Sequence, residues 1–526
     1  MFFVYNYVVK IKVVKHIKTY GRKTIYAPYT ENDFLDNDFN NVLTKVIEIV
    51  GNTKSIHEFN KDQTLYLKNY LYGKQDIYLE KQKLTRPEIN NKTVENWAYA
   101  IIDFKTTYLL GKPIQYVQLN DSGEEEISTL NKYVRYENKK AKDLMLYNDV
   151  LTCGRGFRYV NKDALGQEDE APFEIINIEP ENCEVIYSSE LGHKQLFAYI
   201  VTDMEYYDYY TDNGIVVSKP IPYEEYTIYL KDKLFTISNK DGELKLVEDS
   251  VKPLLWNTHI ITEYYVNEKR IGLIEIGKDL FNDINYLESL DKDDMEQFVN
   301  AIMVFTNAEV SSQDLQDIKE LGAVCINSTD QKKASIDLLQ GRLNANDTQT
   351  YYTRLLTSLH QILGVPLASD SGGITTGDTG KAHLTGQGFT SAGIRAEGDE
   401  TMFGMCDLNS LKTILAICKE TASSSIKNLK VSEVDVRFQR DMSDNLLVKT
   451  QGLMNLYACD IPRKYANSIV NLFSDPYQVT KEQQNLFGDQ VSQQGAKQDN
   501  TTNVEDKASE QDNIITNANQ LDLQEQ

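Results

Sequence analysis

The segment from Leu273 to Phe298 constrains the fold more than any other part of the sequence. Its apolar residues recur at steps of three and four, which places them in one stripe on one face of a helix. They are Leu273, Ile276, Leu280, Ile284, Leu287 and Leu290. Asp and Glu dominate the remaining faces. Such a helix is not suited to a core position, so we predict that it packs along the stripe and leaves its acidic sides facing open space.

A second amphipathic helix is predicted over residues 347–365, since its apolar residues follow the helical period and Pro366 ends it. The two helices bracket an insert, residues 299–346, in which 301–310 and 323–327 are typical of strands. Residues 366–390 are too rich in Gly, Ser and Thr for regular structure without support, which predicts a loop.

The net charge argues against a simple nucleic-acid-binding protein. The chain has 526 residues and a formal net charge of -23, whereas tight phosphate binding requires a basic surface. Either nucleic acid is irrelevant, or the protein handles it without gripping it. We expect no membrane span, because no apolar run approaches about eighteen residues. The six scattered cysteines predict reduced, packed thiols in a cytosolic setting.

Residues 1–30 are predicted to form a β-rich N-terminal arm, and its lysines admit two interpretations. Lys10, Lys12, Lys15 and Lys18 could mark a solvated strand face or a surface that docks a partner. Helices are predicted over 31–50 and 57–72. The tyrosine-rich region 197–265 is predicted to contain paired strands, including a hairpin.

No pattern of catalytic residues is evident. The loop sequence GITTGDTGKAH fails the P-loop spacing, because Thr375 stands where the first glycine belongs and Ala382 follows Lys381. The histidines lack metal-ligand spacing, and no Gly-x-Ser-x-Gly elbow is present. We therefore expect no enzyme, no cofactor and no metal.

An ordered set of motifs resembles the phage portal proteins, in particular the subfamily of similar length from tailed phages of Gram-positive hosts. The motifs are Tyr72-Gly73-Lys74-Gln75, a helix closing in Tyr108-Leu109-Leu110-Gly111-Lys112-Pro113-Ile114, Gly154-Arg155-Gly156-Phe157, the stretch Ile178 to Tyr187, and the run from Val434 to Asp475-Pro476. The resemblance covers about residues 60–484 and implies an α+β fold with an α/β wing, a two-helix stem, a small α/β clip and a mostly helical crown.

On this chain the resemblance implies the following divisions: N-terminal arm 1–30, wing 31–270, first stem helix 271–298, clip 299–346, second stem helix 347–365, tunnel loop 366–390, wing helix 391–429, crown 430–485 and a tail 486–526 that is disordered or helical only on contact with a partner.

The family also implies a function. Portal proteins form a ring of about twelve copies at one capsid vertex, through which double-stranded DNA is packaged and later ejected. The implied partners are the terminase large subunit, a head-tail adaptor and the major capsid or scaffold protein. The protein would be found in the virion, and in the host cytoplasm during assembly, without a membrane.

Three sets of residues follow from this assignment. The subunit-packing seam is Ile276, Leu280, Ile284 and Leu287. The channel-lining residues of the stem are Asp279, Asp283, Glu288 and Lys292, with Lys278 a further candidate for DNA contact. The DNA-facing tunnel-loop residues are Thr375, Thr376, Asp378 and Lys381. A negative wall would repel phosphates and let the duplex slide. The alternative is that these are ordinary surface charges and an ordinary flexible loop.

Two other classes of protein stay open at this point. One is a different virion protein, such as an adaptor or minor capsid protein, although adaptors are usually much shorter. The other is a DNA-processing enzyme such as a terminase nuclease, which would need a P-loop or converging acids from several elements.

Overall fold

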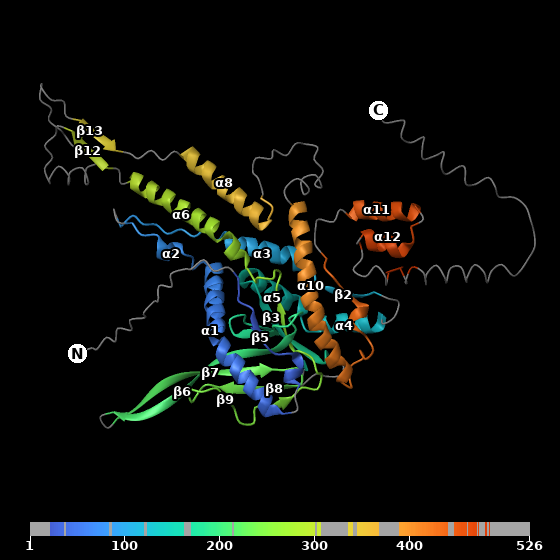
Figure 1. Ribbon diagram of the computed structural model, residues 1–526. Helices are drawn as coiled ribbons and strands as arrows, with labels where there is room; N and C mark the ends of the chain where they lie inside the picture. The colour runs from blue at the N-terminus through green and yellow to red at the C-terminus, as the bar shows by residue number, and fades with distance from the viewer. Residues whose placement is uncertain are drawn as a thin grey trace, which may run out of the picture. The chain divides into compact units, whose positions relative to one another are not determined.

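The computed structural model describes residues 21–35, 38–83, 87–119, 124–162, 170–212, 215–299, 302–306, 335–339, 345–367, 389–439, 446–459 and 461–470, together with residues 472, 479, 480 and 483. Helices and sheets are mixed along the chain, as expected of an α+β protein (Figure 1). The chain divides into two compact units, Met1–Asp441 and Met442–Gln526.

The first unit contains most of the helices. They are α1 (Phe39–Leu71), α2 (Ile77–Glu80), α3 (Trp97–Leu110), α4 (Glu124–Tyr136), α5 (Lys139–Cys153), α6 (Leu273–Val299), α8 (Ala345–Leu363) and α10 (Phe389–Glu420), with short 3-10 helices at Glu31–Phe34 and Val431–Glu433. The predicted bounds of the helices at 273–298 and 347–365 are confirmed to within two residues.

The prediction of two helices over 31–50 and 57–72 was wrong. Residues 31–34 form a separate 3-10 turn, in which Thr30 and Asp33 make a capping box, and α1 then runs unbroken through Gly51. Gly51 looked like a helix end, because an interior glycine costs about 1 kcal/mol. The buried side chains of α1 on both sides of Gly51, among them Val46 and Leu67, outweigh that cost.

The largest sheet has seven strands in the order β1-β5-β6-β7-β8-β10, with β9 also paired to β8. Its strands are β1 (Ile25–Ala27), β5 (Cys183–Ser188), β6 (Gln195–Asp212), β7 (Ile215–Tyr229), β8 (Lys233–Ser238), β9 (Lys245–Leu246) and β10 (Lys252–Pro253). Only the β1–β5 pair is parallel, and all the others are antiparallel. The predicted strand pairing in the tyrosine-rich region is confirmed.

Three smaller sheets complete the β-structure of the described residues. A three-stranded sheet has the order β11-β3-β4, and two pairs are β14–β2 and β12–β13. Their strands are β2 (Gln115–Gln118), β3 (Gly156–Lys162), β4 (Phe173–Ile178), β11 (Ile261–Tyr264), β12 (Ile302–Thr306), β13 (Ser335–Leu339) and β14 (Val434–Arg437). In the insert, β12 confirms the first predicted strand, the predicted strand at 323–327 lies outside the described residues, and β13 was not predicted.

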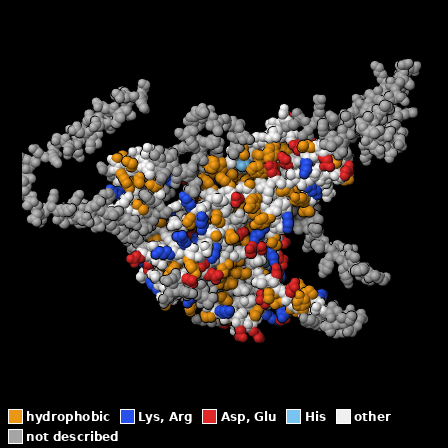
Figure 2. Space-filling model, turned by 180° about the vertical axis from the view of Figure 1, so that it is seen from behind, with side chains coloured by type: hydrophobic (Ala, Val, Ile, Leu, Met, Phe, Trp, Pro, Cys, Tyr) orange, Lys and Arg blue, Asp and Glu red, His pale blue; other side chains and the backbone are white. Residues whose placement is uncertain are grey.

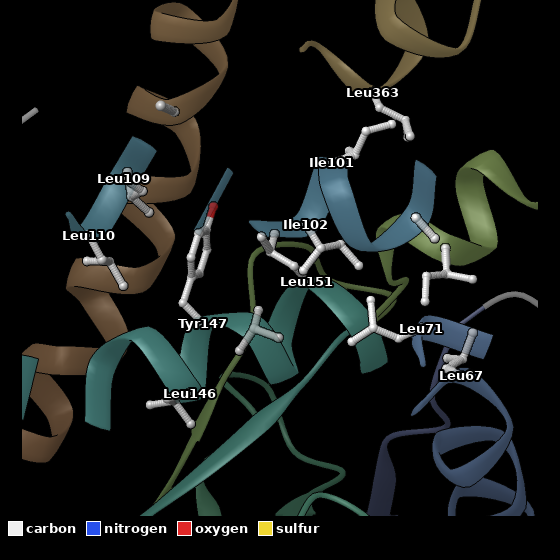
Figure 3. Close-up of a cluster of buried hydrophobic side chains, with 14 of the residues drawn as sticks. Leu67, Leu71, Ile101, Ile102, Leu109, Leu110, Leu146, Tyr147, Leu151 and Leu363 are labelled. Atoms are coloured by element: carbon white, nitrogen blue, oxygen red, sulfur yellow. The ribbon is translucent and has the colours of Figure 1, made fainter. Parts of the chain in front are cut away.

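One helical core holds the centre of the first unit together. Figure 3 shows side chains of α1, α3, α5 and α8 meeting there, including Leu71, Ile102, Leu151 and Leu363. Ile284 of α6 belongs to the same cluster. Burial of this apolar surface, at about 25 cal/mol per Å², is what holds α6 and α8 against the rest of the unit.

A buried charge cluster fixes α10 to the sheet beneath it. Arg158 of β3 lies between two carboxylates, with Nη2 2.7 Å from Asp143 Oδ1 and Nη1 3.4 Å from Asp407 Oδ1. Lys139 Nζ is 3.0 Å from the same Asp407 oxygen, and Tyr116 donates to Asp407 Oδ2 at 2.8 Å. Since a charge buried without a partner is costly, the cluster sets the position of α10 along the unit.

The second unit contains α11 (Leu446–Ala458) and α12 (Arg463–Val470). Tyr457 donates to Asn467 Oδ1 at 2.6 Å, and Asn467 donates to Thr480 at 2.9 Å. The two helices agree with those implied for the crown. The strand at 434–437 pairs with β2 and belongs to the first unit, and the division between wing and crown at residue 430 stays a prediction.

Candidate functional site

Helices α6 and α8 pack against each other as an antiparallel pair joined by the insert (Figure 1). The two helices pack closely at Gly277. A Cβ there would lie 2.8 Å from Phe281 Cε2 and 3.1 Å from Leu363 Cδ1. A larger residue at 277 would therefore push the end of α8 away from the start of α6.

The residues of the predicted apolar seam differ in how deeply this packing buries them. Ile284 is fully buried in the helical core, whereas Ile276 is 48% exposed. Leu280 and Leu287 lie between these extremes, partly buried against the same core. Ile284 therefore cannot contact a neighbouring subunit, and its assignment to the seam was wrong. The physical reason is that α6 packs against its own chain first, and Ile284 is on the side that does so.

A row of polar side chains ties another side of α6 to residues 75–96. The row is Asn282, Asn285, Ser289 and Asp293, spaced by three or four residues. Asn282 donates to Asp76, and Asn285 donates to Gln75 and accepts from the Glu95 N–H. Ser289 accepts from the Thr93 N–H, and Asp293 accepts from the Asn91 N–H and from Lys81. The sequence analysis did not predict this row, although its spacing of three and four residues is the signal of one helix face.

Asp293 is the anchor at the far end of the row. It is fully buried, with Lys81 Nζ 2.7 Å from Oδ2 and the Asn91 backbone N–H donating to Oδ1 at 2.6 Å. Burial alone would raise its pKa, but these bonds outweigh burial and lower it. The sequence predicted that the acidic sides of this helix face open space, and for Asp293 that prediction was wrong.

The open face of α6 is acidic. Asp279 and Asp283 are exposed one turn apart, and Asp294 lies on the same side. Partial desolvation and the neighbouring Asp279 both raise the pKa of Asp283. Figure 2 shows acidic side chains (red) gathered over the α6–α8 pair at the upper right of the view. The face therefore concentrates negative charge where solvent reaches it.

The four predicted channel-lining residues do not share this face. Nine residues separate Lys292 from Asp283, which puts it about 180° around the helix. Glu288 is half-buried, and its pKa is raised by desolvation and by the nearby Glu95 and Asp291. Of the predicted set, Asp279 and Asp283 alone lie together. The four cannot all line one channel surface.

The Lys278 side chain interacts with residues of its own subunit. Its Nζ is 3.0 Å from Asp76 Oδ2 and 4.7 Å from the centroid of the Tyr66 ring. A lysine held by a carboxylate and a ring within its own subunit is poorly placed to contact DNA. The tunnel-loop residues Thr375, Thr376, Asp378 and Lys381 lie outside the described residues.

The outer face of α8 has a different character. A shallow groove along it is lined by Gln349, Thr350, Thr353, Arg354, Thr357 and Ser358. The hydroxyls of the three threonines donate to the carbonyl four residues earlier, at 2.7–2.8 Å. With their hydroxyls bonded inward, the threonines form a flat, small-residue surface around the single cation Arg354. The spacing 350, 353, 357 was a sequence signal for this face that was overlooked.

Within the residues that the structure describes, no group of His, Cys, Asp and Glu is arranged to hold a metal ion. A membrane-crossing helix is likewise missing from that part of the chain. The described cysteines are unpaired, with Cys153, Cys183, Cys406 and Cys418 buried and Cys459 exposed.

Comparison with known families identifies the class. The model of the family described as "Phage portal protein, SPP1 Gp6-like" matches residues 51–496. The chain belongs to this family of phage portal proteins, which confirms the resemblance drawn from the motifs. Members of this family are structural, non-enzymatic components of the phage virion.

A particular relative is the portal protein of Bacillus phage SPP1. It is 23% identical to this chain over 277 residues, which cover 48% of this chain and 51% of the relative. The matched region thus spans about half the length of that protein.

Proposed function

We propose that this portal protein assembles into a ring of about twelve copies at one capsid vertex and serves as the channel for double-stranded DNA during packaging and ejection. The observation that carries the proposal is the open acidic face of α6, with Asp279 and Asp283 exposed on a helix whose Ile284 and Asp293 are buried against its own chain. A wall of such faces repels phosphate, so the duplex passes without adhering.

The same helix provides the contact between neighbouring subunits. Ile276 is 48% exposed, and Leu280 and Leu287 keep part of their surface open beside it. These three residues lie within about 40° of one another around the helix, so they form one apolar strip flanking the acidic face. The subunit-packing seam is therefore Ile276, Leu280 and Leu287, without Ile284.

The remaining parts take the roles that the family suggests. The pair α6–α8 is the stem, the insert with β12–β13 is the clip, the large sheets and α10 form the wing, and α11 and α12 belong to the crown. Residues 366–390 form the tunnel loop, with Thr375, Thr376, Asp378 and Lys381 facing DNA. The clip docks the terminase large subunit during packaging and the head-tail adaptor afterwards.

Arg354 supplies the sparse positive charge of the stem. It stands alone among neutral threonines on the outer face of α8, in a groove open to solvent. One cation in this groove gives weak contact with the DNA backbone, which breaks as the duplex moves, because affinity for DNA rises with the number of phosphates neutralised.

Negative-stain microscopy of the purified protein tests the proposal. Rings with a central hole are expected, and monomers or small dimers under all conditions would refute the ring. Incubation with plasmid DNA, Mg²⁺ and ATP tests the rival enzyme class, for which cleavage or nucleotide hydrolysis by the protein alone would be the sign.

A further inference from the structure

Strands β6 and β7 extend beyond the sheet to which they belong. They pair with each other from Ala198–Tyr229 to Asp212–Ile215, but β5 reaches β6 only as far as Ile200, and β8 reaches β7 only over 225–229. Figure 1 shows the two strands leaving the sheet as a ribbon. A two-stranded ribbon is marginally stable in water, so this one calls for a further partner.

Both faces of the ribbon are open near its root. Thr202, Asp203, Met204 and Glu205 are all exposed, although successive side chains of a strand point to opposite faces. Tyr207 is 54% exposed. At the lower right of Figure 2, hydrophobic-class and acidic side chains lie together where the ribbon emerges.

The two edges of the ribbon are not equivalent. Pro220 and Pro222 in β7 pair with Tyr207 and Glu205 of β6. Proline has no N–H, so in a paired strand its nitrogen faces away from the partner. The outer edge of β7 therefore lacks two donors and is blocked against another strand. The outer edge of β6 from Thr202 to Asp212 contains no proline and keeps its amides.

The open edge is acidic and aromatic. Residues 202–212, TDMEYYDYYTD, contain four acids and no Lys or Arg. The ribbon already binds lysine on one face, where Lys240 Nζ lies 5.1 Å from the Tyr206 ring and 5.8 Å from the Tyr223 ring. A strand that carries lysines between apolar residues would complement this edge.

Such a strand exists in the same chain. Residues 1–20, MFFVYNYVVKIKVVKHIKTY, contain four lysines and no acid, and are rich in Val, Ile and Tyr. We call them the basic segment. Fully extended, twenty residues reach about 66 Å, while the open edge of β6 is about 33 Å long, so the segment can cover it.

The topology brings the basic segment to this edge. β1 runs parallel to β5, and β5 runs antiparallel to β6, so the chain before β1 lies on the side toward which β6 leaves the sheet. Contacts agree: the Lys23 N–H donates to Asn60 Oδ1 at 2.9 Å, and the next residue of α1, Lys61, places Nζ 2.9 Å from Asp203 Oδ2. Lys23, three residues after the segment, thus contacts α1 one residue away from the lysine that reaches the root of the open edge, and Gly21, which directly follows the segment, donates to Glu275 Oε1 at 2.9 Å.

We propose that the basic segment, residues 1–20, adds as an antiparallel strand to the edge Thr202–Asp212 of β6, beyond the point where β5 ends. Main-chain hydrogen bonds supply the pairing, and lysines opposite Glu205 and Asp208 set its register. The segment completes a three-stranded extension of the large sheet.

Hydrogen–deuterium exchange of the purified full chain tests the pairing. In the intact protein, amides within Met204–Thr211 are expected to exchange at least about tenfold more slowly than in a variant lacking residues 1–20, while amides of Glu225–Tyr229 are unchanged and serve as the internal control. Equal exchange of Met204–Thr211 in the two proteins would overturn the proposal.

A charge swap separates strand pairing from a general loss of structure. Lys12→Glu with Lys15→Glu, the two lysines that can lie opposite Asp208 and Glu205 in one antiparallel register, is expected to release the β6 edge as the deletion does, and adding Glu205→Lys with Asp208→Lys is expected to restore protection. If the first pair leaves protection intact, or the second pair fails to restore it, complementary charge does not hold the segment there. Should the deletion variant fold poorly, Ile11→Pro with Val13→Pro blocks pairing in an otherwise full-length chain.

Discussion

Ile276 and Ile284 lie eight residues apart on α6 and share one sequence stripe, yet Ile276 is 48% exposed and Ile284 is fully buried. Eight residues turn a helix by about 800°, which leaves the two side chains about 80° apart. That rotation is enough to place one in the core of its own subunit and the other on the surface. Substitutions at these two positions can therefore test folding of the subunit and assembly of the ring separately.

Replacing Ile276 by Asp should stop ring assembly and leave the subunit folded. An exposed site tolerates the charge, whereas a buried contact between subunits does not. We expect an unchanged circular-dichroism melt of the dilute subunit, together with the loss of rings from size-exclusion profiles and negative-stain images. Normal rings formed by this variant would exclude Ile276 from the seam.

The matched variant Ile284→Asp should behave in the opposite way. The substitution buries an unpaired carboxylate in the helical core, which lowers the free energy of unfolding of the subunit by several kcal/mol. The thermal midpoint of the subunit should drop sharply. A stable, folded but monomeric protein would instead restore Ile284 to the seam.

Gly277 and Gly398 are both helical glycines, and alanine at each should change stability with opposite sign. Gly398 in α10 has open space around it, so alanine should stabilise the protein by about 1 kcal/mol through helix propensity. At Gly277 the new methyl group would lie 2.8 Å from Phe281 Cε2, so overpacking of about 1–3 kcal/mol exceeds that gain. Urea unfolding of both variants measures the difference, and stabilisation at 277 would contradict the close packing of α6 on α8.

Glu184 makes folding sensitive to acid. It is buried and accepts two bonds from Arg155, at 2.6 and 2.7 Å, with Asn60 donating at 3.1 Å. Burial by itself would raise its pKa, but Arg155 and His57 outweigh burial and hold the pKa below the ordinary 4.5. Its stabilisation is thus fully present above pH 4.5 and is lost as pH falls through the lowered value.

Glu184→Gln should therefore cost about 3–5 kcal/mol at neutral pH, because Arg155 is left buried without a counter-charge. The variant should also lose part of the acid dependence below pH 4.5, measured by urea midpoints across pH. Glu190→Gln, at an exposed site, is the control and should stay within about 0.5 kcal/mol of the parent protein. If the stability of Glu184→Gln depends on pH below 4.5 as steeply as that of the parent protein, other groups cause the acid sensitivity.

Asp279→Asn tests the acidic face. Removal of one of two like charges four residues apart should stabilise the helix by about 0.2–0.5 kcal/mol and lower the pKa of Asp283, readable by NMR titration. In assembled rings it should increase DNA retention at low salt, and Asp62→Asn on α1, which removes the same charge elsewhere, should not. Equal retention by the two variants would remove the α6 face from the channel wall.

The sequence predicted the α6 and α8 helices well because a 3.6-residue period of apolar side chains is a local property. It also predicted the paired strands of the tyrosine-rich region and, from motifs taken in order, the family. It failed at Gly51, where long-range packing of α1 overrode a local helix-ending signal. A strand beginning at Val434 was predicted and is present as β14, but its partner β2, more than three hundred residues earlier, was not predicted.

The amino-acid sequence by itself determined that α6 would be amphipathic, that its charge would be acidic and that the chain is a portal protein. The tertiary structure alone decided which residues of that helix are available: it buried Ile284, paired Asp293 with Lys81, turned Lys278 toward Asp76 and left Asp279 and Asp283 open. A periodic pattern gives the angle of each side chain around its own helix. Only the neighbours that pack against the helix decide which of those angles face the interior.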